Sequence, residues 1–324
     1  MKNLVLLFSL LVIASCSVSE PSGIPIIVDA DTNNELDDQH ALAYLFFNED
    51  IFDIKGITTN ATFNGGGIEE HYKEAQRVME LCDVWEKYPL LVGADSDFET
   101  IFPTLQSENF DGHEAVDFII GKALEQKNQK LVLVPIGKLT NIALALEKEP
   151  TIKDKVRIVW LGSNYPRPGE YNQVNDIAAL NYILNQEVEF EMVMVRYGEA
   201  SGSDAVRVTP DDVMANLAGK GPQVNPVEGR HGGHFTNFGD YSVNLFSGID
   251  LHGTPPGRAL FDLVALAIVK TPAWGEKKMI PAPLLVDNAW QERPDNSHKI
   301  AIWENFDKQS IIDDFYEGIH KASQ

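Results

Sequence analysis

Four aspartates within ten positions, Asp29, Asp31, Asp37 and Asp38, are the residues of this chain best suited to chemistry. Like charges this close repel one another, and burying them without a counter-charge is costly. A divalent cation would resolve the conflict, and carboxylate oxygens favour Ca²⁺ or Mg²⁺ over zinc. A helix-cap role is the alternative, because Asp caps helices and stabilises the positive end of the helix dipole. That role accounts for Asp37 or Asp38, but not for all four residues together.

The elements around the acidic residues predict where they lie. The short aliphatic run Ile24–Val28 before them has the character of a buried strand. After them, apolar residues recur at helical spacing up to Phe46, which predicts a helix that begins near Asp37 or Asp38. The carboxylates therefore belong to a loop at the carboxyl end of the first strand, where open α/β sheets bind ligands.

Strand-like and helix-like runs alternate through the first two thirds of the chain, which predicts an α/β fold with an open, mainly parallel sheet flanked by helices. The further expected strands, which complete the sheet, are Asp53–Thr59, Pro89–Val92, Leu131–Pro135, Val156–Leu161 and Glu191–Val195, and the expected helices are Ile68–Trp85, Ala115–Gln126 and Asn141–Leu146.

The segment Gly221–Arg258 breaks this alternation. It is rich in Gly, Pro and Asn, and it holds three of the eight histidines. Irregular stretches longer than about 15 residues in a compact domain are usually lids or binding loops. A variable surface excursion remains the alternative.

Residues 1–15 are expected to be a signal peptide. Lys2 supplies a positive start, and the apolar run Leu4–Ile13 is too short to span a bilayer. The segment Ile13–Cys16 resembles a bacterial lipobox, with cleavage before Cys16, which would then carry lipid. We therefore expect a lipid-anchored protein of the bacterial cell envelope, periplasmic or surface-exposed, that meets the membrane through this anchor only. A plain secretory signal with an incidental cysteine is the alternative.

Residues 16–23 read as a tether and residues 24–324 as one domain. With lipid on Cys16, Cys82 is the only thiol of the mature protein, so no disulfide framework can form and the fold depends on its own core. The formal net charge of −22 argues against nucleic acid as a partner. A small-molecule substrate is the expected partner, and a homo-oligomeric assembly stays open.

Five short segments, in chain order, carry recognisable motifs. The acidic loop matches D-x-D-P-G-x-D-D, with TNNEL in place of P-G-x, an insertion of two residues. ITTNATFN resembles T-T-x-x-G-N, and Val134–Leu146 (VPIGKLTNIALAL) matches V-P-x-G-x-L-T-N-I-A. Glu170–Asp176 (EYNQVND) matches E-F-N-x-x-x-D, and Phe261–Val269 (FDLVALAIV) matches a late H-D-P-x-A-V block. Together they cover most of the chain after the targeting segment, which therefore resembles the inosine–uridine-preferring nucleoside hydrolase family.

The resemblance implies a Rossmann-like fold and one Ca²⁺, held by the carboxylates of Asp31, Asp38 and Asp262 and by the backbone carbonyl of Ile136. A carbonyl at a strand end, just before a glycine, is free to point at an ion. A helix-cap role is the alternative for Asp262, which stands at an expected helix start.

The resemblance also implies the reaction, which is hydrolysis of the N-glycosidic bond of ribonucleosides or related ribosides. The ion would lower the pKa of a water, and Asp31 would take the proton of that water as general base. Bond cleavage builds positive charge on the sugar ring, which nearby anionic groups stabilise. Two alternatives stay open: a hydrolase of another glycoside, or a surface lipoprotein that binds nucleosides or sugars without catalysis.

Five residues match family positions that hydrogen-bond ribose hydroxyls, namely Asp37, Asn64, Asn164, Glu170 and Asn172. Carboxylates accept hydrogen bonds from a diol, and amides both donate and accept them. Asn60 is the alternative to Asn64, and the spacing around Asn164 differs from that of the family. Asn172 also suits a turn.

One position departs from the family. A histidine often precedes the late metal-binding aspartate and protonates purine leaving groups, whereas this chain has Phe261 there. Phenylalanine cannot donate a proton. The candidates for a replacement acid are His231, His234 and His252 on the irregular segment, with His234 the first choice. Alternatively, the leaving group needs little protonation.

Overall fold

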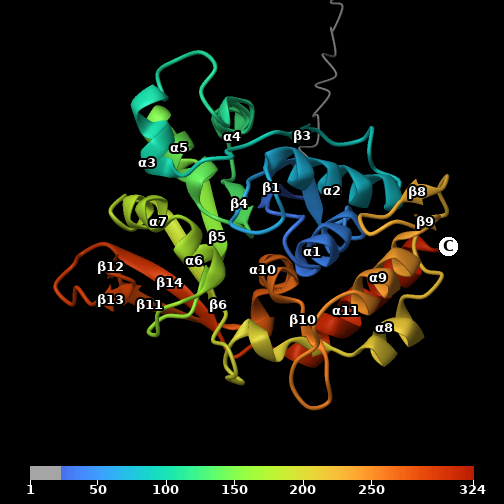
Figure 1. Cartoon of the computed structure of the whole chain (residues 1–324). Helices are drawn as coiled ribbons and strands as arrows, with labels where there is room; N and C mark the ends of the chain where they lie inside the picture. Colours follow the sequence, from blue (N-terminus) through green and yellow to red (C-terminus); the bar gives the residue numbers. More distant parts are fainter. Residues whose placement is uncertain (1–22) are drawn as a thin grey trace, which may run out of the picture.

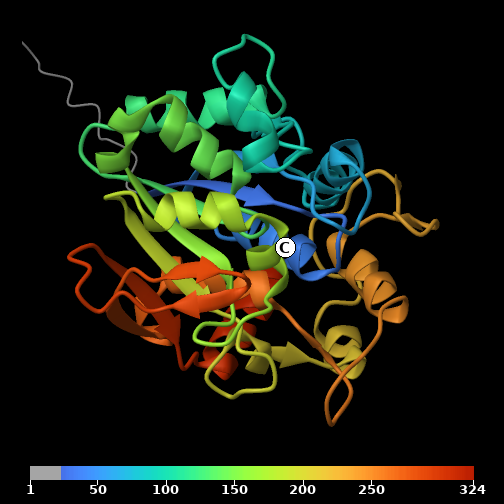
Figure 2. The same cartoon turned by 60° about the vertical axis from the view of Figure 1, so that its left-hand side comes forward.

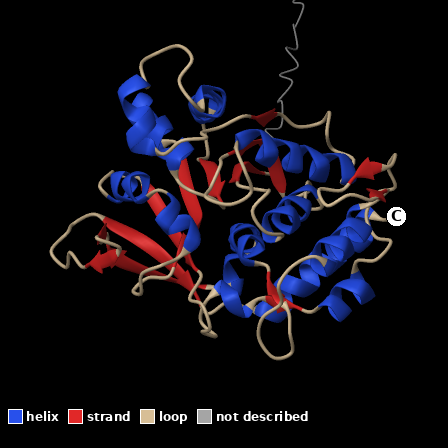
Figure 3. Ribbon diagram, in the orientation of Figure 1, coloured by secondary structure: helices blue, strands red, loops and turns tan. Residues whose placement is uncertain are grey.

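The computed structural model describes residues 23–324. The expected signal peptide and the proposed attachment point at Cys16 lie outside these residues. Figure 3 shows that helices surround a central sheet. Within residues 23–324, none of the helices combines the length and the apolar character needed to span a bilayer.

Eight strands form the central sheet in the order β11-β14-β6-β5-β4-β1-β2-β3. All neighbouring strands run parallel except β11 and β14. This arrangement confirms the predicted open, mainly parallel sheet. The strands are β1 (Ile24–Ala30), β2 (Phe52–Thr59), β3 (Leu90–Leu91), β4 (Leu131–Pro135), β5 (Val156–Ser163), β6 (Glu189–Met194), β11 (Glu276–Pro281) and β14 (Lys299–Glu304).

Helices cover both faces of the sheet (Figure 2). In β1, Ile26 and Val28 face one apolar core and Ile27 faces the other, because successive strand side chains point to opposite faces. The first core is closed by α1 (Asp37–Phe46), α2 (Ile68–Leu81), α9 (Phe238–Ser247), α10 (Phe261–Lys270) and α11 (Lys308–Ala322). The second core is closed by α3 (Phe98–Ile101), α4 (His113–Glu125), α5 (Thr140–Lys148) and α7 (Ile177–Leu184).

Short elements complete the chain. Three two-stranded sheets pair β7 (Arg207–Val208) with β10 (Arg258–Ala259), β8 (Val227–Glu228) with β9 (His234–Phe235), and β12 (Leu284–Val286) with β13 (Ala289–Gln291). The remaining helices are α6 (Tyr171–Asn175), α8 (Pro210–Asn216) and the 3₁₀ turns Phe102–Thr104, Pro150–Asp154, Ser203–Ala205 and Pro272–Trp274.

The strand order reverses between β1 and β4. From β1 the chain continues to β2 on one side, and from β4 it continues to β5 on the other. In open α/β sheets the crevice outside the carboxyl ends of two such strands is the usual place for a ligand. The four aspartates run from the end of β1 into the first turn of α1: Asp29 lies in β1, Asp31 follows it, and Asp37 and Asp38 begin α1. Helix α10 lies against α1 (Figure 1).

Two sequence expectations were wrong. The sheet does not end with the strand near Glu191, because β14 pairs with β6 and β11 pairs with β14. The segment Gly221–Arg258 is not irregular throughout, since it contains α9 and short strands. Helix α9 buries Phe238, Tyr241 and Leu245 in the first core, and this tertiary burial outweighs the local Gly and Asn content.

Candidate active site

The acidic loop is buried at the carboxyl end of β1. Asp29 and Asp31 end the strand region, while Asp37 and Asp38 are the first two residues of α1. Each of the four side chains is at most 7% exposed. The residue at the cap of α1 is Leu36, which has no capping side chain. Neither Asp37 nor Asp38 therefore caps α1, although both lie in its first turn, where a carboxylate also stabilises the positive end of the helix dipole.

Asp262 joins this group from a distant part of the chain. It lies in the first turn of α10, whose cap is Leu260, so its carboxylate does not cap the helix either. One carboxylate oxygen each from Asp37, Asp38 and Asp262 lie within 4.8 Å of one another. Asp31 is linked to this group because its backbone N–H donates to Asp38 Oδ1 over 3.1 Å.

Burial and mutual repulsion shift these carboxyl groups strongly. Burial, with a smaller effect of neighbouring carboxylates, raises the pKa of Asp31 and of Asp37 from 3.8 to about 7. The same causes raise the pKa of Asp38 and of Asp262 well above 3.8. Buried carboxylates that repel one another need a cation, and hard oxygen donors fit a divalent ion such as Ca²⁺. The residues present therefore fit a metal site.

Asp29 has a different environment from the other acidic residues of the loop. Its carboxylate accepts hydrogen bonds from Thr58 Oγ1 at 2.6 Å, Asn141 Nδ2 at 2.7 Å and Asn60 Nδ2 at 3.0 Å. Burial raises its pKa to about 6, although these donors oppose the shift. Asp29 thereby fastens β1 to β2 and to α5, and it contributes to the framework rather than to the cavity.

The backbone after β4 comes close to Asp31. Ile136 lines the same cavity as the acidic residues, and its carbonyl accepts a hydrogen bond from Asn172 Nδ2 at 2.8 Å. A Cβ atom on Gly137 would lie 2.8 Å from Asp31 Oδ1 and 2.6 Å from Asn60 Oδ1. Only glycine lets the chain pass this close to the general-base candidate.

These side chains open into one cavity of about 780 Å³. It brings together most of the residues singled out from the sequence, namely Asp31, Asp37, Asp38, Ile136, Glu170, Asn172 and Asp262. Glu170 is 3% exposed, and burial raises its pKa to about 7. The cavity is thus acidic at the end that holds Asp37, Asp38 and Asp262, and the sugar-binding candidates Glu170 and Asn172 line the same cavity.

Two sugar-binding candidates do not line this cavity. Asn64 is exposed, and its backbone N–H donates to the hydroxyl of Tyr171 at 2.9 Å. Asn164 donates to the carbonyl of Pro168 at 3.2 Å and accepts from the backbone N–H of Tyr197 at 3.2 Å, which ties its amide into a loop. Asn60, the alternative to Asn64, does not line the cavity either; its amide donates a hydrogen bond to the Asp29 carboxylate.

The cavity also contains residues that the sequence analysis did not assign. The ring of Tyr197 meets the ring of Phe261 edge to face, with centroids 5.9 Å apart. Arg258 is 8% exposed and forms an ion pair with Glu35, a residue of the two-residue-longer TNNEL segment. The two-residue insertion was the sequence feature that could have pointed to Glu35. No sequence feature pointed to Tyr197, because its contact with Phe261 depends on how the loop after β6 folds back.

The three histidines considered as acids separate in space. His252 lines the cavity. His231 lines a second, smaller cavity, and His234 is exposed on β9. The structure thus favours His252 over His234, which was the first choice from sequence.

Comparisons with known proteins agree with this geometry. The family model for inosine-uridine preferring nucleoside hydrolases matches residues 26–309. Over 191 residues the chain is 27% identical to the Crithidia fasciculata enzyme of that description, covering 52% of this chain and 59% of the relative. A 98-residue segment, 28% of this chain, is 33% identical to the Leishmania major protein and spans 31% of it. The chain thus aligns with less than two thirds of each relative.

Solved structures extend the likeness in fold. A plant nucleoside hydrolase superimposes with a TM-score of 0.69 at 16% identity, over 92% of this chain and 99% of that one. A purine-preferring ribonucleoside hydrolase from Gardnerella vaginalis gives a TM-score of 0.65 at 19% identity over the same shares. At identities of 16% and 19% these superpositions show a shared fold and nothing further.

Proposed function

This chain belongs to the inosine–uridine-preferring nucleoside hydrolase family, and on that premise we propose that it is an enzyme that hydrolyses the N-glycosidic bond of ribonucleosides or related ribosides. The observation that carries the proposal is the group of buried carboxylates, Asp31, Asp37, Asp38 and Asp262, at one end of a substrate-sized cavity. Cavities of about 300–1,000 Å³ at a strand-order reversal are typical of small-molecule sites.

We further propose Ca²⁺ as the ion. Asp31, Asp38, Asp262 and the carbonyl of Ile136 would hold it, and the closeness of Asp37 adds another carboxylate to the group. Oxygen donors alone, with no cysteine or histidine among them, suit this ion better than zinc. When bound, the ion would supply the positive charge that makes a nearby water more acidic.

Residues of the chain would carry out the other steps of the reaction. Asp31 takes a proton from the attacking water as general base, with Thr62 Oγ1 holding its other oxygen at 2.5 Å. The Glu170 carboxylate and the side-chain oxygen of Asn172 accept hydrogen bonds from the ribose hydroxyls, which fixes the sugar ring beside Asp31; both N–H groups of the Asn172 amide are already donated to the carbonyls of Ile136 and Leu161. The carboxylates also stabilise the positive charge that develops on the ring as the bond breaks.

Phe261 predicts which substrates react fastest. Because it cannot protonate the leaving group, we expect a nitrophenyl riboside to be cleaved far faster than inosine in a release assay with a panel of ribosides. If His252 supplies the proton, His252→Ala should slow inosine cleavage by about 10²-fold or more and spare the nitrophenyl riboside.

His234→Ala is the matched control, because this exposed histidine lies outside the cavity lining and its loss should leave both rates unchanged. Release from none of the ribosides would contradict the proposed function. Equal slowing of both substrates by His252→Ala would show that His252 positions the sugar instead.

We also propose that the protein is held at the cell envelope by lipid on Cys16, on the strength of the Ile13–Cys16 segment. Cys16→Ser is expected to move the protein from the membrane fraction to the soluble fraction, since the mature chain would then have no lipid. A fractionation blot makes the measurement. An unchanged distribution would contradict the anchor.

A further inference from the structure

We propose that a second cavity, beside the candidate active site, binds a phosphate group. This cavity, of about 240 Å³, is lined by Asn33, Asn34, Glu70, Lys73, Arg77, Arg230 and His231. The whole chain carries a formal charge of −22, yet this lining holds three permanently cationic side chains and one carboxylate. A local reversal of the charge of an acidic protein attracts an anion.

Arg230 has a guanidinium N–H donor that no acceptor of the described residues uses. Its Nε donates to His231 Nε2 over 3.0 Å, while its Nη1 is buried and has no acceptor among the described residues. Within residues 23–324 no carboxylate forms an ion pair with Arg230, in contrast to Arg77. A guanidinium with unused donors matches the geometry of a phosphate group, which accepts two parallel hydrogen bonds.

Arg77 and Lys73 add charge from α2. Arg77 is held in place by an ion pair with the buried Glu74. Glu74 is in turn bonded by the Tyr241 hydroxyl at 2.5 Å and by Gln39 Nε2 at 3.0 Å. Lys73 is paired only with the exposed Glu70 at 2.9 Å, and surface pairs of this kind are weak enough to give way to a ligand. The lining and Glu74 together hold three cationic side chains and two carboxylates, and Asp38 of the candidate active site acts on Arg230 from outside the lining.

Asn34 connects the two cavities, because it lines both of them. It belongs to the TNNEL segment, whose extra residues separate Asp31 from Asp37. The Asn34 amide forms no side-chain hydrogen bond with the rest of the described chain, so it can donate to a ligand in either cavity. The phosphate group can therefore be part of a phosphorylated riboside or be free inorganic phosphate, since the two present the same chemistry.

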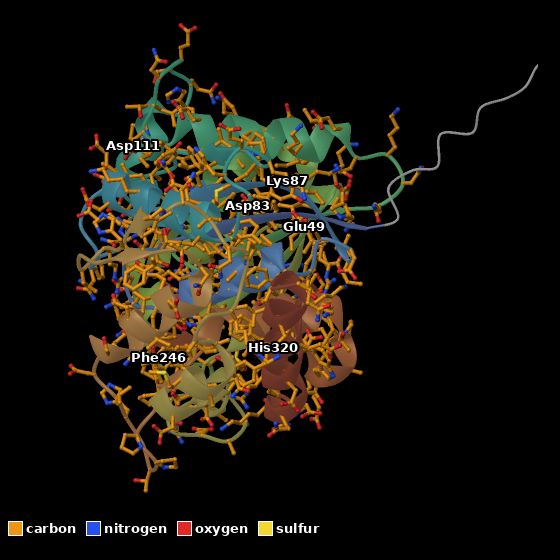
Figure 4. The ribbon with its side chains drawn as sticks, turned by 90° about the vertical axis from the view of Figure 1, so that its right-hand side faces the viewer. Glu49, Asp83, Lys87, Asp111, Phe246 and His320 are labelled. Carbon is orange, nitrogen blue, oxygen red and sulfur yellow. The ribbon has the colours of Figure 1, made fainter. Side chains whose placement is uncertain are left out.

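Isothermal titration calorimetry of the full chain with inorganic phosphate at low ionic strength tests the site. We expect saturable binding, an affinity at least tenfold lower in Arg230→Gln, and a smaller loss in Lys73→Gln. Lys87→Gln is the control. The Lys87 side chain forms an ion pair with Glu49 over 2.6 Å (both labelled in Figure 4), and neither residue lines the cavity, so this variant should bind phosphate as the wild type does. An absence of saturable binding, or equal affinity in Arg230→Gln and wild type, would overturn the proposal.

Asp38→Ala separates this site from the proposed function. Phosphate binding should survive this change, whereas binding that disappears would place the phosphate on the cation and overturn the inference. Ribose 5-phosphate identifies the source of the phosphate. If it binds at least tenfold tighter than both ribose and inorganic phosphate, and Arg230→Gln removes that gain, the phosphate is carried by the substrate. Equal affinity of ribose 5-phosphate and inorganic phosphate supports a site for the free anion.

Discussion

Asp31→Asn is expected to lower kcat by about 10²–10⁴-fold while leaving KM nearly unchanged. An amide cannot take the proton of the attacking water, but it retains the size of the carboxylate and an oxygen that accepts from Thr62 Oγ1. The sugar-binding candidates Glu170 and Asn172 keep their own contacts. Steady-state kinetics with the fastest riboside of the panel measure both constants.

Asp50→Asn is the matched control for this change. Asp50 is exposed and pairs only with the exposed Lys321 at 3.3 Å, so the same loss of a carboxylate should leave kcat unchanged. If Asp31→Asn retained more than half of the wild-type turnover, Asp31 would not be the general base. If instead the Asp31→Asn variant bound no divalent ion, the main role of Asp31 would be that of a metal ligand.

Removal of the divalent ion is expected to abolish activity and to lower the melting temperature. A ligand that binds only the folded state at about one hundred times its Kd contributes about 2.7 kcal/mol, which corresponds to a shift on the order of 5 °C. Added Ca²⁺ should restore both properties in the wild type. Asp38→Ala should remove this recovery, because Asp38 belongs to the group of three carboxylates whose oxygens lie within 4.8 Å.

Differential scanning calorimetry with and without chelator makes this measurement, and ion content is read by metal analysis. Asp50→Ala should respond to chelator as the wild type does. A purified protein that carries no divalent ion, and whose melting temperature chelator does not change, would contradict the metal site.

The pH dependence of the melting temperature provides an independent test of these raised pKa values. In the ion-free protein the pKa values of Asp31 and Asp37 lie near 7, whereas unfolding returns them to about 3.8. Between these values the folded state binds more protons than the unfolded state, so stability falls as the pH rises. The ion-free protein should therefore melt higher at about pH 6 than at about pH 8. The ion-loaded protein should show the opposite trend, because protons compete with the ion for the carboxylates.

The sequence by itself determined the elements that have strong local patterns. The strand Leu131–Pro135 was predicted with its observed bounds, because a short run of five apolar residues that ends in proline is typical of a buried strand. The position of the aspartates at the junction of β1 and α1 also followed from the sequence, since the change from an aliphatic strand to helical periodicity is local. The family resemblance then supplied Asp262, which no local pattern connects to that junction.

Only the tertiary structure decided which side chains meet. Asp262 joins Asp37 and Asp38 because α10 packs against α1, a contact between segments more than 200 residues apart. Other loop contacts leave Asn64 and Asn164 outside the cavity, and the tertiary structure places His252 rather than His234 in its lining and pairs Glu35 with Arg258. Spacing along a chain fixes the order of side chains, whereas burial against distant elements fixes their surroundings. Those surroundings determine which carboxylates are left for an ion and which, like Asp29, are already satisfied by hydrogen bonds.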